Sequence, residues 1–255
     1  FGQNFLISRV HIEKIADAAK LTEADSVLEI GPGAGVLTVE LARRAGKVTS
    51  IELDRNLLPL LDEVLAEFDN VTILQGDALA LPLPEANKVV ANIPYNITSP
   101  LLVRLLSHRP AFQSLTLLVQ KEVAQRLVAA PGTSDYGALT VFVNYYAKAR
   151  IAVQVPKGVF LPPPKIDSAA IHLEVHSTPP VEVPSEEALF AVSRAAFGQR
   201  RKTIANALSA GLDRRREQIE SALNQVGIDP LRRGETLSLA DFAALACTLF
   251  DSQMA

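Results

Sequence analysis

The fold is decided by Glu29-Ile30-Gly31-Pro32-Gly33-Ala34-Gly35, which lies where an apolar, β-branched run of residues ends. Glycine allows a tight turn in which the backbone approaches a ligand closely before a helix begins. The fingerprint of dinucleotide-binding proteins would require another glycine at position 36, which is occupied by Val36. The spacing therefore predicts a ligand-binding turn in an open α/β sheet and argues against a diphosphate cofactor.

Short apolar runs alternate with segments of helical periodicity from Ser26 to about Val155, which is typical of a parallel sheet with crossover helices. The six runs expected to form parallel strands cover residues 26–30, 48–53, 71–75, 88–91, 115–119 and 151–155. A seventh run, 168–175, follows a proline-rich stretch that has no room for a helical crossover, so it should pair antiparallel with the sixth strand. The predicted fold class is α/β, with the Rossmann-like sheet of class I methyltransferases rather than that of dinucleotide dehydrogenases.

The composition changes at residues 177–184, which include three prolines and show little apolar periodicity. We expect a methyltransferase domain over residues 1–178 and a small all-helical domain over residues 179–255. The signals for helix ends in the second domain are the predicted caps Ser185 and Ser238 with Asp241, and the predicted stops Gly211 and Gly227.

Basic residues are concentrated in the second domain, although the whole chain has a net charge of -3. Up to residue 175 the chain has 16 Lys and Arg against 18 Asp and Glu, whereas residues 194–233 have 9 against 4. A basic helical segment suits the phosphates of RNA, and we expect Arg200, Arg201 and Lys202 to contact them. Residues 214–216 could equally form a solvated helix face.

Two carboxylates follow the second and third predicted strands. Glu52, 21 residues after Gly31, can accept hydrogen bonds from both hydroxyls of a ribose, and Asp77 can accept one from an adenine amino group. Asp54 competes with Glu52 for the first role, although strand alternation places it in the loop. Because ligands of open α/β sheets bind at the carboxyl ends of strands, Gly31, Glu52 and Asp77 predict a site for S-adenosylmethionine.

A tetrapeptide, Asn92-Ile93-Pro94-Tyr95, follows the fourth predicted strand at the same edge. Adenine's amino nitrogen is a poor nucleophile because its lone pair is delocalised into the ring. Acceptors at the Asn92 side chain and the Ile93 carbonyl could bind both amine hydrogens and free that lone pair. Pro94 fixes the turn, and Tyr95 offers a ring on which a base can stack. The alternative is a proline turn capped by asparagine with a tyrosine in the core.

Bulk properties limit the compartment and the partners. The only cysteine, Cys247, excludes an internal disulfide and a cysteine-based zinc cluster, so we expect the cytoplasm and no metal. No apolar run approaches the roughly 18 to 20 residues that cross a bilayer, so no membrane partner is expected. No sustained heptad pattern indicates a coiled-coil dimer, and we expect a monomer.

These motifs together resemble the ribosomal RNA adenine dimethyltransferases of the KsgA type, over nearly the whole chain. The opening, Phe1-Gly2-Gln3-Asn4-Phe5-Leu6, is similar to the start of that family, in which Asn4 and Leu6 would lie over the cofactor. The family's glycine-rich loop, ribose acid, adenine-binding acid and acceptor tetrapeptide match, in order, Gly31, Glu52, Asp77 and Asn92 to Tyr95.

A second part of the resemblance lies before the seventh strand, at Phe160-Leu161-Pro162-Pro163-Pro164-Lys165-Ile166-Asp167-Ser168. It implies that Phe160 sandwiches the target adenine against Tyr95. The alternative for Phe160 is an apolar residue that packs under the proline-rich loop. Residues 197–203 also resemble the family's second domain, and together with the stretch from Phe160 to Ser168 they favour the small-subunit RNA branch of the family.

The resemblance implies a substrate: two adjacent adenosines in a hairpin loop near the 3′ end of small-subunit (16S) ribosomal RNA, each methylated twice. The expected partners are that RNA and the immature small ribosomal subunit. Three alternatives stay open. They are a related enzyme of the antibiotic-resistance branch that methylates adenine in large-subunit ribosomal RNA, a methyltransferase for adenine in DNA or glutamine in protein, and a ribosome-assembly factor that acts mainly by binding.

Overall fold

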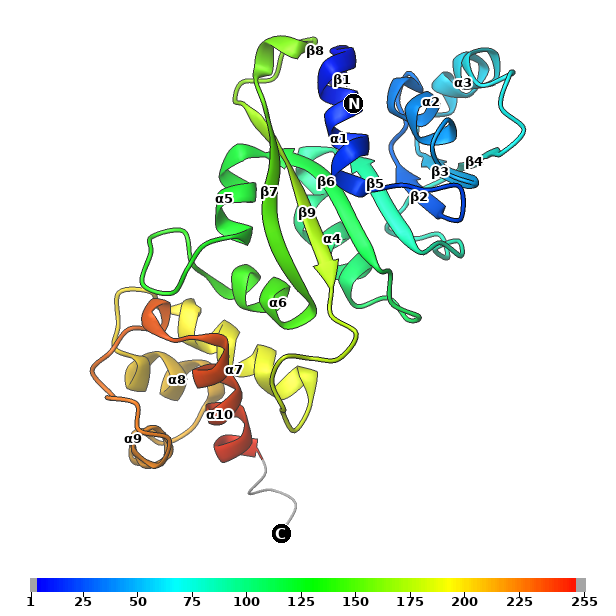
Figure 1. Ribbon diagram of the computed structural model, residues 1–255. Helices are drawn as coiled ribbons and strands as arrows, with labels where there is room; N and C mark the ends of the chain where they lie inside the picture. Colours follow the sequence, from blue (N-terminus) through cyan, green and yellow to red (C-terminus); the bar gives the residue numbers. More distant parts are fainter. Residues whose placement is uncertain (1–3, 251–255) are drawn as a thin grey trace. The chain divides into compact units, whose positions relative to one another are not determined.

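The structure is a computed structural model that describes residues 4–250. Phe1–Gln3 of the opening motif lie outside the described residues. The main sheet has seven strands in the order β4-β3-β2-β5-β6-β9-β7 (Figure 1). Their bounds are β2 (Ser26–Ile30), β3 (Lys47–Glu52), β4 (Val71–Gln75), β5 (Lys88–Asn92), β6 (Ser114–Gln120), β7 (Ala147–Val155) and β9 (Ser168–Val175).

Strand β9 comes last in the chain and is antiparallel to both of its neighbours in the sheet, β6 and β7. The other strand pairs of the sheet are parallel. The predicted pattern of six parallel strands and one antiparallel strand is therefore confirmed, as is the pairing of the seventh strand with the sixth. The insertion of β9 between β6 and β7 was not predicted. It lets β9 satisfy the backbone groups of two strands, and its residues from Ser168 to Leu173 are all buried.

Helices connect the strands and cover the sheet. They are α1 (Arg9–Ala19), α2 (Val36–Ala42), α3 (Leu58–Val64), α4 (Thr98–Leu106) and α5 (Lys121–Leu127), with short 3-10 turns η1 (Arg55–Leu57), η2 (Tyr95–Ile97) and η3 (Lys157–Val159). In addition, β1 (Phe5–Leu6) and β8 (Phe160–Leu161) form a two-stranded antiparallel ribbon. The core under α1 and α2 is continuous, because buried strands such as Val27 to Ile30 face helices on the sheet surface.

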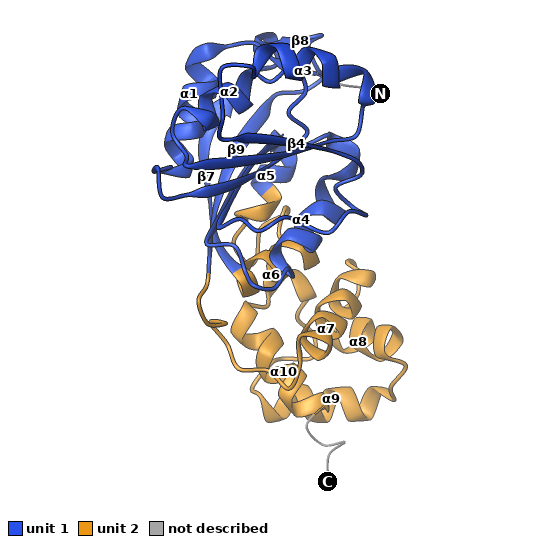
Figure 2. Cartoon of the chain, turned by 90° about the vertical axis from the view of Figure 1, so that its right-hand side faces the viewer, with its two compact units in different colours: residues 1–125, 147–175 blue, residues 126–146, 176–255 orange. Residues whose placement is uncertain are grey.

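The chain divides into two compact units, coloured separately in Figure 2. The first contains the described residues up to Gln125 together with Ala147–Val175, and the second contains Arg126–Tyr146 together with the described residues from His176 on. The boundary after Val175 lies three residues before the predicted one. The prediction of two contiguous domains, however, did not assign residues 126–146 to the helical unit.

The second unit is helical throughout its described residues. Its elements are α6 (Ala138–Tyr146), α7 (Glu186–Gly198), α8 (Ile204–Leu212), α9 (Arg216–Gln225), η4 (Gly234–Thr236) and α10 (Leu239–Phe250). Aromatic rings fasten α6 to α7, with Phe142 and Tyr145 at 5.0 and 5.6 Å from the Phe190 ring. These contacts explain why α6 belongs to this unit. None of the helices between residues 4 and 250 is both long and apolar enough to cross a bilayer.

Two of the predicted caps are confirmed and one predicted stop is wrong. The Ser185 hydroxyl accepts a hydrogen bond from the Ala188 amide at 3.1 Å. Ser238 and Asp241 form a reciprocal capping box. Gly211, by contrast, lies inside α8, which ends at Leu212 and is followed by Asp213 as a cap in the left-handed conformation. A Cβ atom at Gly211 would come within 2.5 Å of the Ala195 Cβ, so this glycine permits close helix packing instead.

Candidate active site

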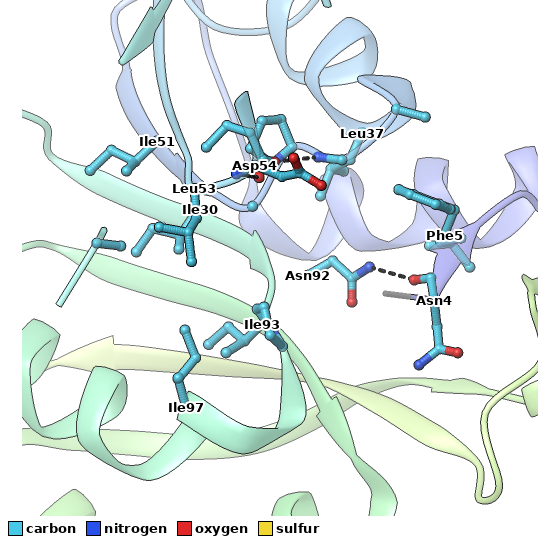
Figure 3. A pocket seen from close by; sticks show the side chains of 18 of the residues that line it. Asn4, Phe5, Ile30, Leu37, Ile51, Leu53, Asp54, Asn92, Ile93 and Ile97 are labelled. Atoms are coloured by element: carbon cyan, nitrogen blue, oxygen red, sulfur yellow. Dashed lines mark hydrogen bonds between the residues drawn. The ribbon is translucent and has the colours of Figure 1, made fainter. Parts of the chain in front are cut away.

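A cavity of about 470 Å³ opens at the carboxyl ends of the parallel strands (Figure 3). Its lining unites residues from β1, from the turn after β2, from the ends of β3 and β5, and from the loop after β4. The predicted site residues that line it are Asn4, Leu6, Gly31, Glu52, Asp77, Asn92, Pro94 and Tyr95. Residues far apart in the sequence therefore meet at one edge of the sheet.

The glycine turn forms one wall of the cavity. Gly31 and Gly33 adopt φ angles of +70° and +59°, which side chains other than glycine rarely tolerate. The Gly31 amide donates to the Ile51 carbonyl at 2.9 Å, and a Cβ at Gly33 would lie 3.0 Å from the Phe5 ring. The turn is thus fixed against β3 on one side and against the N-terminal segment on the other.

Glu52 is held rigidly at the end of β3, where its exposed fraction is 3%. One carboxylate oxygen accepts from the Gly33 amide at 3.2 Å, and the other accepts from the Asp54 amide at 2.8 Å. Asp54 is half-buried, and one of its oxygens accepts from the backbone and side-chain nitrogens of Asn56 at 3.0 and 2.9 Å. Both carboxylates line the cavity, but only Glu52 is buried within its wall.

Asp77 lies in an exposed loop that another helix holds in place. One Asp77 oxygen accepts from the Leu79 amide at 2.8 Å, which leaves its other oxygen available at the cavity. The Arg104 guanidinium, on α4, donates to the carbonyls of Leu79 and Leu81. Sequence reasoning missed this contact, because a lone arginine on an amphipathic helix carries no signal that it clamps a distant loop.

The Asn92 side chain is oriented by the N-terminal segment. Its Nδ2 donates to the Asn4 carbonyl at 3.4 Å, as the dashed line in Figure 3 marks. A carbonyl can only accept, so this contact directs the amide nitrogen to Asn4 and leaves the Asn92 Oδ1 as an acceptor. The adjacent Ile93 amide donates to the Leu118 carbonyl at 3.2 Å, which fixes the backbone of the tetrapeptide to β6.

Tyr95 is half-buried at the cavity and is held at both ends. Its hydroxyl shares a hydrogen bond of 2.7 Å with the Ser168 hydroxyl, and its carbonyl accepts from the Thr98 hydroxyl at 3.2 Å. Pro94 precedes it as the first flanking residue of η2, with φ at -56°. The partner Ser168, the last residue of the stretch that begins at Phe160, was not predicted to touch the tetrapeptide.

Phe160 lies in the core and does not line the cavity. Its exposed fraction is 3%, and it packs in the apolar cluster that includes Leu6 and Ile12. In the ribbon of β1 and β8, Leu6 is its direct partner. The arrangement matches the packing alternative, and the structure does not bring the Phe160 ring face to face with Tyr95 across the cavity.

Glu29 is a buried carboxyl beside the glycine turn, to which sequence reasoning gave no role. One oxygen accepts from the Ser50 hydroxyl at 2.6 Å, and the other has no partner within the described part of the chain. Burial raises the pKa of Glu29 to about 7, against the hydrogen bond from Ser50 that lowers it, and the negative charge of Glu52 adds to the rise. The sequence feature that could have revealed this buried carboxyl is a single acidic residue inside an apolar strand.

The predicted RNA-contacting residues lie in the second unit and differ from one another in their contacts. Arg200 forms an ion pair with Glu235 at 3.0 Å and donates to the Ser134 carbonyl. Arg201 and Lys202 are exposed, and neither side chain has a hydrogen bond or ion pair with any residue in the range 4–250. Of the later basic run, Arg214 donates to the Leu249 carbonyl at 2.7 Å and Arg216 pairs with Glu220 at 2.7 Å.

Comparisons with other sequences point to one family. The sequence profile described as "Ribosomal RNA adenine dimethylase" matches residues 1–245. The "Ribosomal RNA small subunit methyltransferase A" of Geobacillus thermodenitrificans is 48% identical over 261 residues, which cover 97% of this chain and 89% of the relative. The protein of the same name from Pelotomaculum thermopropionicum is 49% identical over 267 residues, which cover 98% and 90%.

Two solved structures are similar over nearly the whole chain. A dimethyladenosine transferase from Plasmodium falciparum has a TM-score of 0.86 at 28% identity and covers 98% of each chain. The 23S rRNA methyltransferase ErmE has a TM-score of 0.75 at 32% identity, covering 96% of this chain and 99% of its own. The fold is therefore that of rRNA methyltransferases with a Rossmann-like sheet.

Proposed function

This chain belongs to the ribosomal RNA adenine dimethylase family, and from that premise we propose that it methylates adenosines of small-subunit (16S) ribosomal RNA. The reaction is the S-adenosylmethionine-dependent dimethylation of the exocyclic amines of two adjacent adenosines in the 3′-terminal hairpin loop. The observation that carries this proposal is the orientation of the Asn92 amide by Asn4, in a cavity that Glu52 also lines.

The residues of the cavity fit S-adenosylmethionine. The buried Glu52 carboxylate can accept the two ribose hydroxyls, and the free Asp77 oxygen can accept from the adenine amino group. The glycine turn lets backbone approach the ligand without a Cβ in the way, and Asn4 and Leu6 also line the cavity. When bound, this cofactor supplies a methyl group activated on a sulfonium.

Catalysis rests on what Asn92 does to the acceptor amine. Its Oδ1 accepts a hydrogen bond from one N–H of the amine, and the Ile93 carbonyl accepts a hydrogen bond from the other, so that the nitrogen lone pair leaves conjugation with the ring. The site needs no strong base before the attack, because the neutral amine is the nucleophile. Holding the amine in line with the methyl group then supplies much of the rate.

Tyr95 provides the platform for the flipped adenine. Stacking on an aromatic ring offsets part of the cost of removing a base from its neighbours, and a hairpin loop lowers that cost further. Arg201 and Lys202, with Arg200 beside them, bind phosphates of the RNA.

We also propose that the enzyme is a monomer, that it works in the cytoplasm, and that it acts on the immature small ribosomal subunit. The test is incubation with labelled S-adenosylmethionine and separated small- and large-subunit particles, followed by nucleoside analysis. We expect dimethyladenosine in the small-subunit RNA only. Label in the large-subunit RNA would favour the antibiotic-resistance branch to which the ErmE likeness points. Tight binding to small subunits without label would favour an assembly factor.

A further inference from the structure

The Tyr95 hydroxyl reaches across the site to the start of another strand. Its partner, the Ser168 hydroxyl at 2.7 Å, belongs to the first residue of β9, and the exposed fraction of Ser168 is 0%. A buried hydroxyl without a partner costs free energy, and Tyr95 supplies that partner. The two side chains lie 73 positions apart in the sequence, so this contact forms only in the folded sheet.

Ser168 is a rigid anchor because its backbone is fixed on three sides. In the sheet it is in register with Gln120 on β6 and with Val155 on β7. The preceding residue, Asp167, accepts from the Lys157 amide at 2.9 Å through its side chain and from the Lys121 amide at 3.0 Å through its carbonyl. The hydroxyl therefore stands at a fixed place at the end of β9.

These contacts restrict the motion of the Tyr95 side chain. A tyrosine side chain turns about two bonds, χ1 and χ2. Anchoring the far hydroxyl restricts χ1, the rotation that would swing the whole ring away from the cavity, whereas the hydroxyl lies on the χ2 axis and does not restrict rotation about it. The near end is fixed separately, through the Thr98 hydroxyl that donates to the Tyr95 carbonyl. A displacement of about 1 Å in a positioning group can lower a rate by about two orders of magnitude, so a free ring would matter for turnover.

We propose that Ser168 is a positioning residue of the acceptor site, whose hydroxyl holds the Tyr95 ring as the wall against which the target adenine stacks. Ser168 acts through Tyr95 and does not touch the reacting atoms. The inference rests on the proposed function for its substrate, but the fixed ring itself is a property of the protein alone.

The first experiment compares S168A, Y95F and the double variant in steady-state methylation of small-subunit particles. Y95F keeps the ring and removes the same hydrogen bond. We expect each single variant to lower kcat about tenfold, with KM for the RNA within about twofold because phosphate contacts dominate RNA affinity. The double variant should be no slower than either single variant, since all three lack one bond.

A matched control is S193A, which removes another buried serine hydroxyl, on α7 in the second unit; that hydroxyl has no hydrogen-bond partner among the described residues. It should methylate at the wild-type rate. If S168A lowers the melting temperature and the cofactor affinity in step with kcat, Ser168 is a structural residue and the proposal fails. Additive losses in the double variant would also overturn it.

The second measurement needs no substrate and so separates this inference from the proposed function. The chain has only 4 tyrosines, and fluorine NMR of 3-fluorotyrosine-labelled protein would give a signal for each, with Tyr95 assigned by its loss in Y95F. We expect the Tyr95 signal to shift or broaden in S168A and to be unchanged in S193A. An unchanged signal overturns the anchor even if the enzyme is active, whereas a shifted signal in a protein that methylates no ribosomal RNA overturns only the proposed function.

Discussion

At the scale of single residues, Asn92 is predicted both to border the cofactor and to act on the acceptor amine, and its main effect should be on the amine. The contact with Asn4 leaves the Asn92 Oδ1 as the acceptor that faces the amine. We expect N92A to lower the rate of methyl transfer by about 100-fold or more, a loss of the size seen when a transition-state contact is removed. Single-turnover kinetics measures the rate, while calorimetry should give cofactor and RNA affinities within about threefold of wild type. Unchanged turnover would contradict the mechanism.

Glu29 makes a residue-scale prediction about pH. Burial is the main reason that its pKa rises to about 7 in the folded protein, from 4.5 for an ordinary glutamate. The folded state therefore holds its proton more tightly than the unfolded state, so the stabilisation is complete below about pH 4.5 and is lost as the pH rises through 7. Relative to E29Q, the wild type should lose about 3 kcal/mol between pH 5 and pH 8.

Thermal and urea unfolding of both proteins at pH 5, 6.5 and 8 would measure this difference. Glutamine keeps the shape of Glu29 and can still accept from the Ser50 hydroxyl, so it isolates the charge. A wild-type protein that differs from E29Q by the same amount at pH 5 and pH 8 would show that Glu29 does not titrate in this range.

At the scale of elements, α4 connects the acceptor tetrapeptide with the loop that carries Asp77. It begins at Thr98, after the η2 turn that starts at the last residue of the tetrapeptide, and its Arg104 donates to two carbonyls of the loop that carries Asp77. We expect R104A to weaken S-adenosylmethionine binding about tenfold while kcat at saturating cofactor stays near wild type, because the proposed role of Asp77, on that loop, is to bind the cofactor and not the acceptor adenosine. R104K should recover part of the affinity, since one ammonium replaces a guanidinium that reaches both carbonyls.

Calorimetry with the cofactor, followed by single-turnover kinetics at saturation, tests this element. The control is R109A, three residues beyond the end of the same helix, whose guanidinium donates to the nearby carbonyls of Leu106 and His108. Equal losses in R104A and R109A would indicate a general effect on α4 rather than a clamp on the Asp77 loop.

The strands were predictable from the sequence because their signal is local. Buried parallel strands read as short β-branched runs, and β2, β4 and β9 have the predicted bounds. Contacts between residues that are far apart in the sequence left no such local signal. The proline-rich stretch excluded a helix before β9 but could not show that β9 enters between two strands. Gly211 was read as a stop because its neighbour on another helix, Ala195, is invisible in sequence.

The same division holds for the site. Residues that follow strand ends in order, such as Gly31, Glu52 and Asn92, could be placed at one edge from topology alone. Ser168, Arg104 and the contact of Asn4 with Asn92 depend on side-chain directions in three dimensions, which no spacing encodes. For Phe160 the sequence motif was recognised, but its position could not be predicted. A motif that resembles a family's signature does not specify whether the phenylalanine ring lies in the cavity or in the core.

At the scale of the whole molecule, the chain order and the compact units do not coincide. The helical unit takes residues 126–146 from the middle of the chain, since the α6 rings pack on α7. A change in composition reveals a domain boundary only where the chain passes from one unit to the other and does not return. The chain does so near residue 176. An inserted segment keeps the alternation of helix and strand around it and is therefore not visible as a boundary.

The uneven charge of the molecule makes the last prediction, which concerns RNA affinity. Arg201 and Lys202 are exposed and make no ion pair within the described range, whereas Arg200 is engaged by Glu235 and Ser134. R201A/K202A should therefore weaken RNA binding and reduce the slope of log affinity against log salt by roughly 1.5, for two lost phosphate contacts. Adding R200A should cost stability of the helical unit more than it further changes the slope.

The matched control for this prediction is R43A/K47A, which removes two exposed positive charges from the first unit, near the start of β3 and thus away from the carboxyl ends of the strands. Binding titrations from about 50 to 200 mM salt separate the two variants, because a change in total charge lowers affinity in both, whereas lost phosphate contacts lower the slope only in R201A/K202A. Equal slopes for both variants would mean that net charge alone, and no defined contact at the start of α8, holds the RNA.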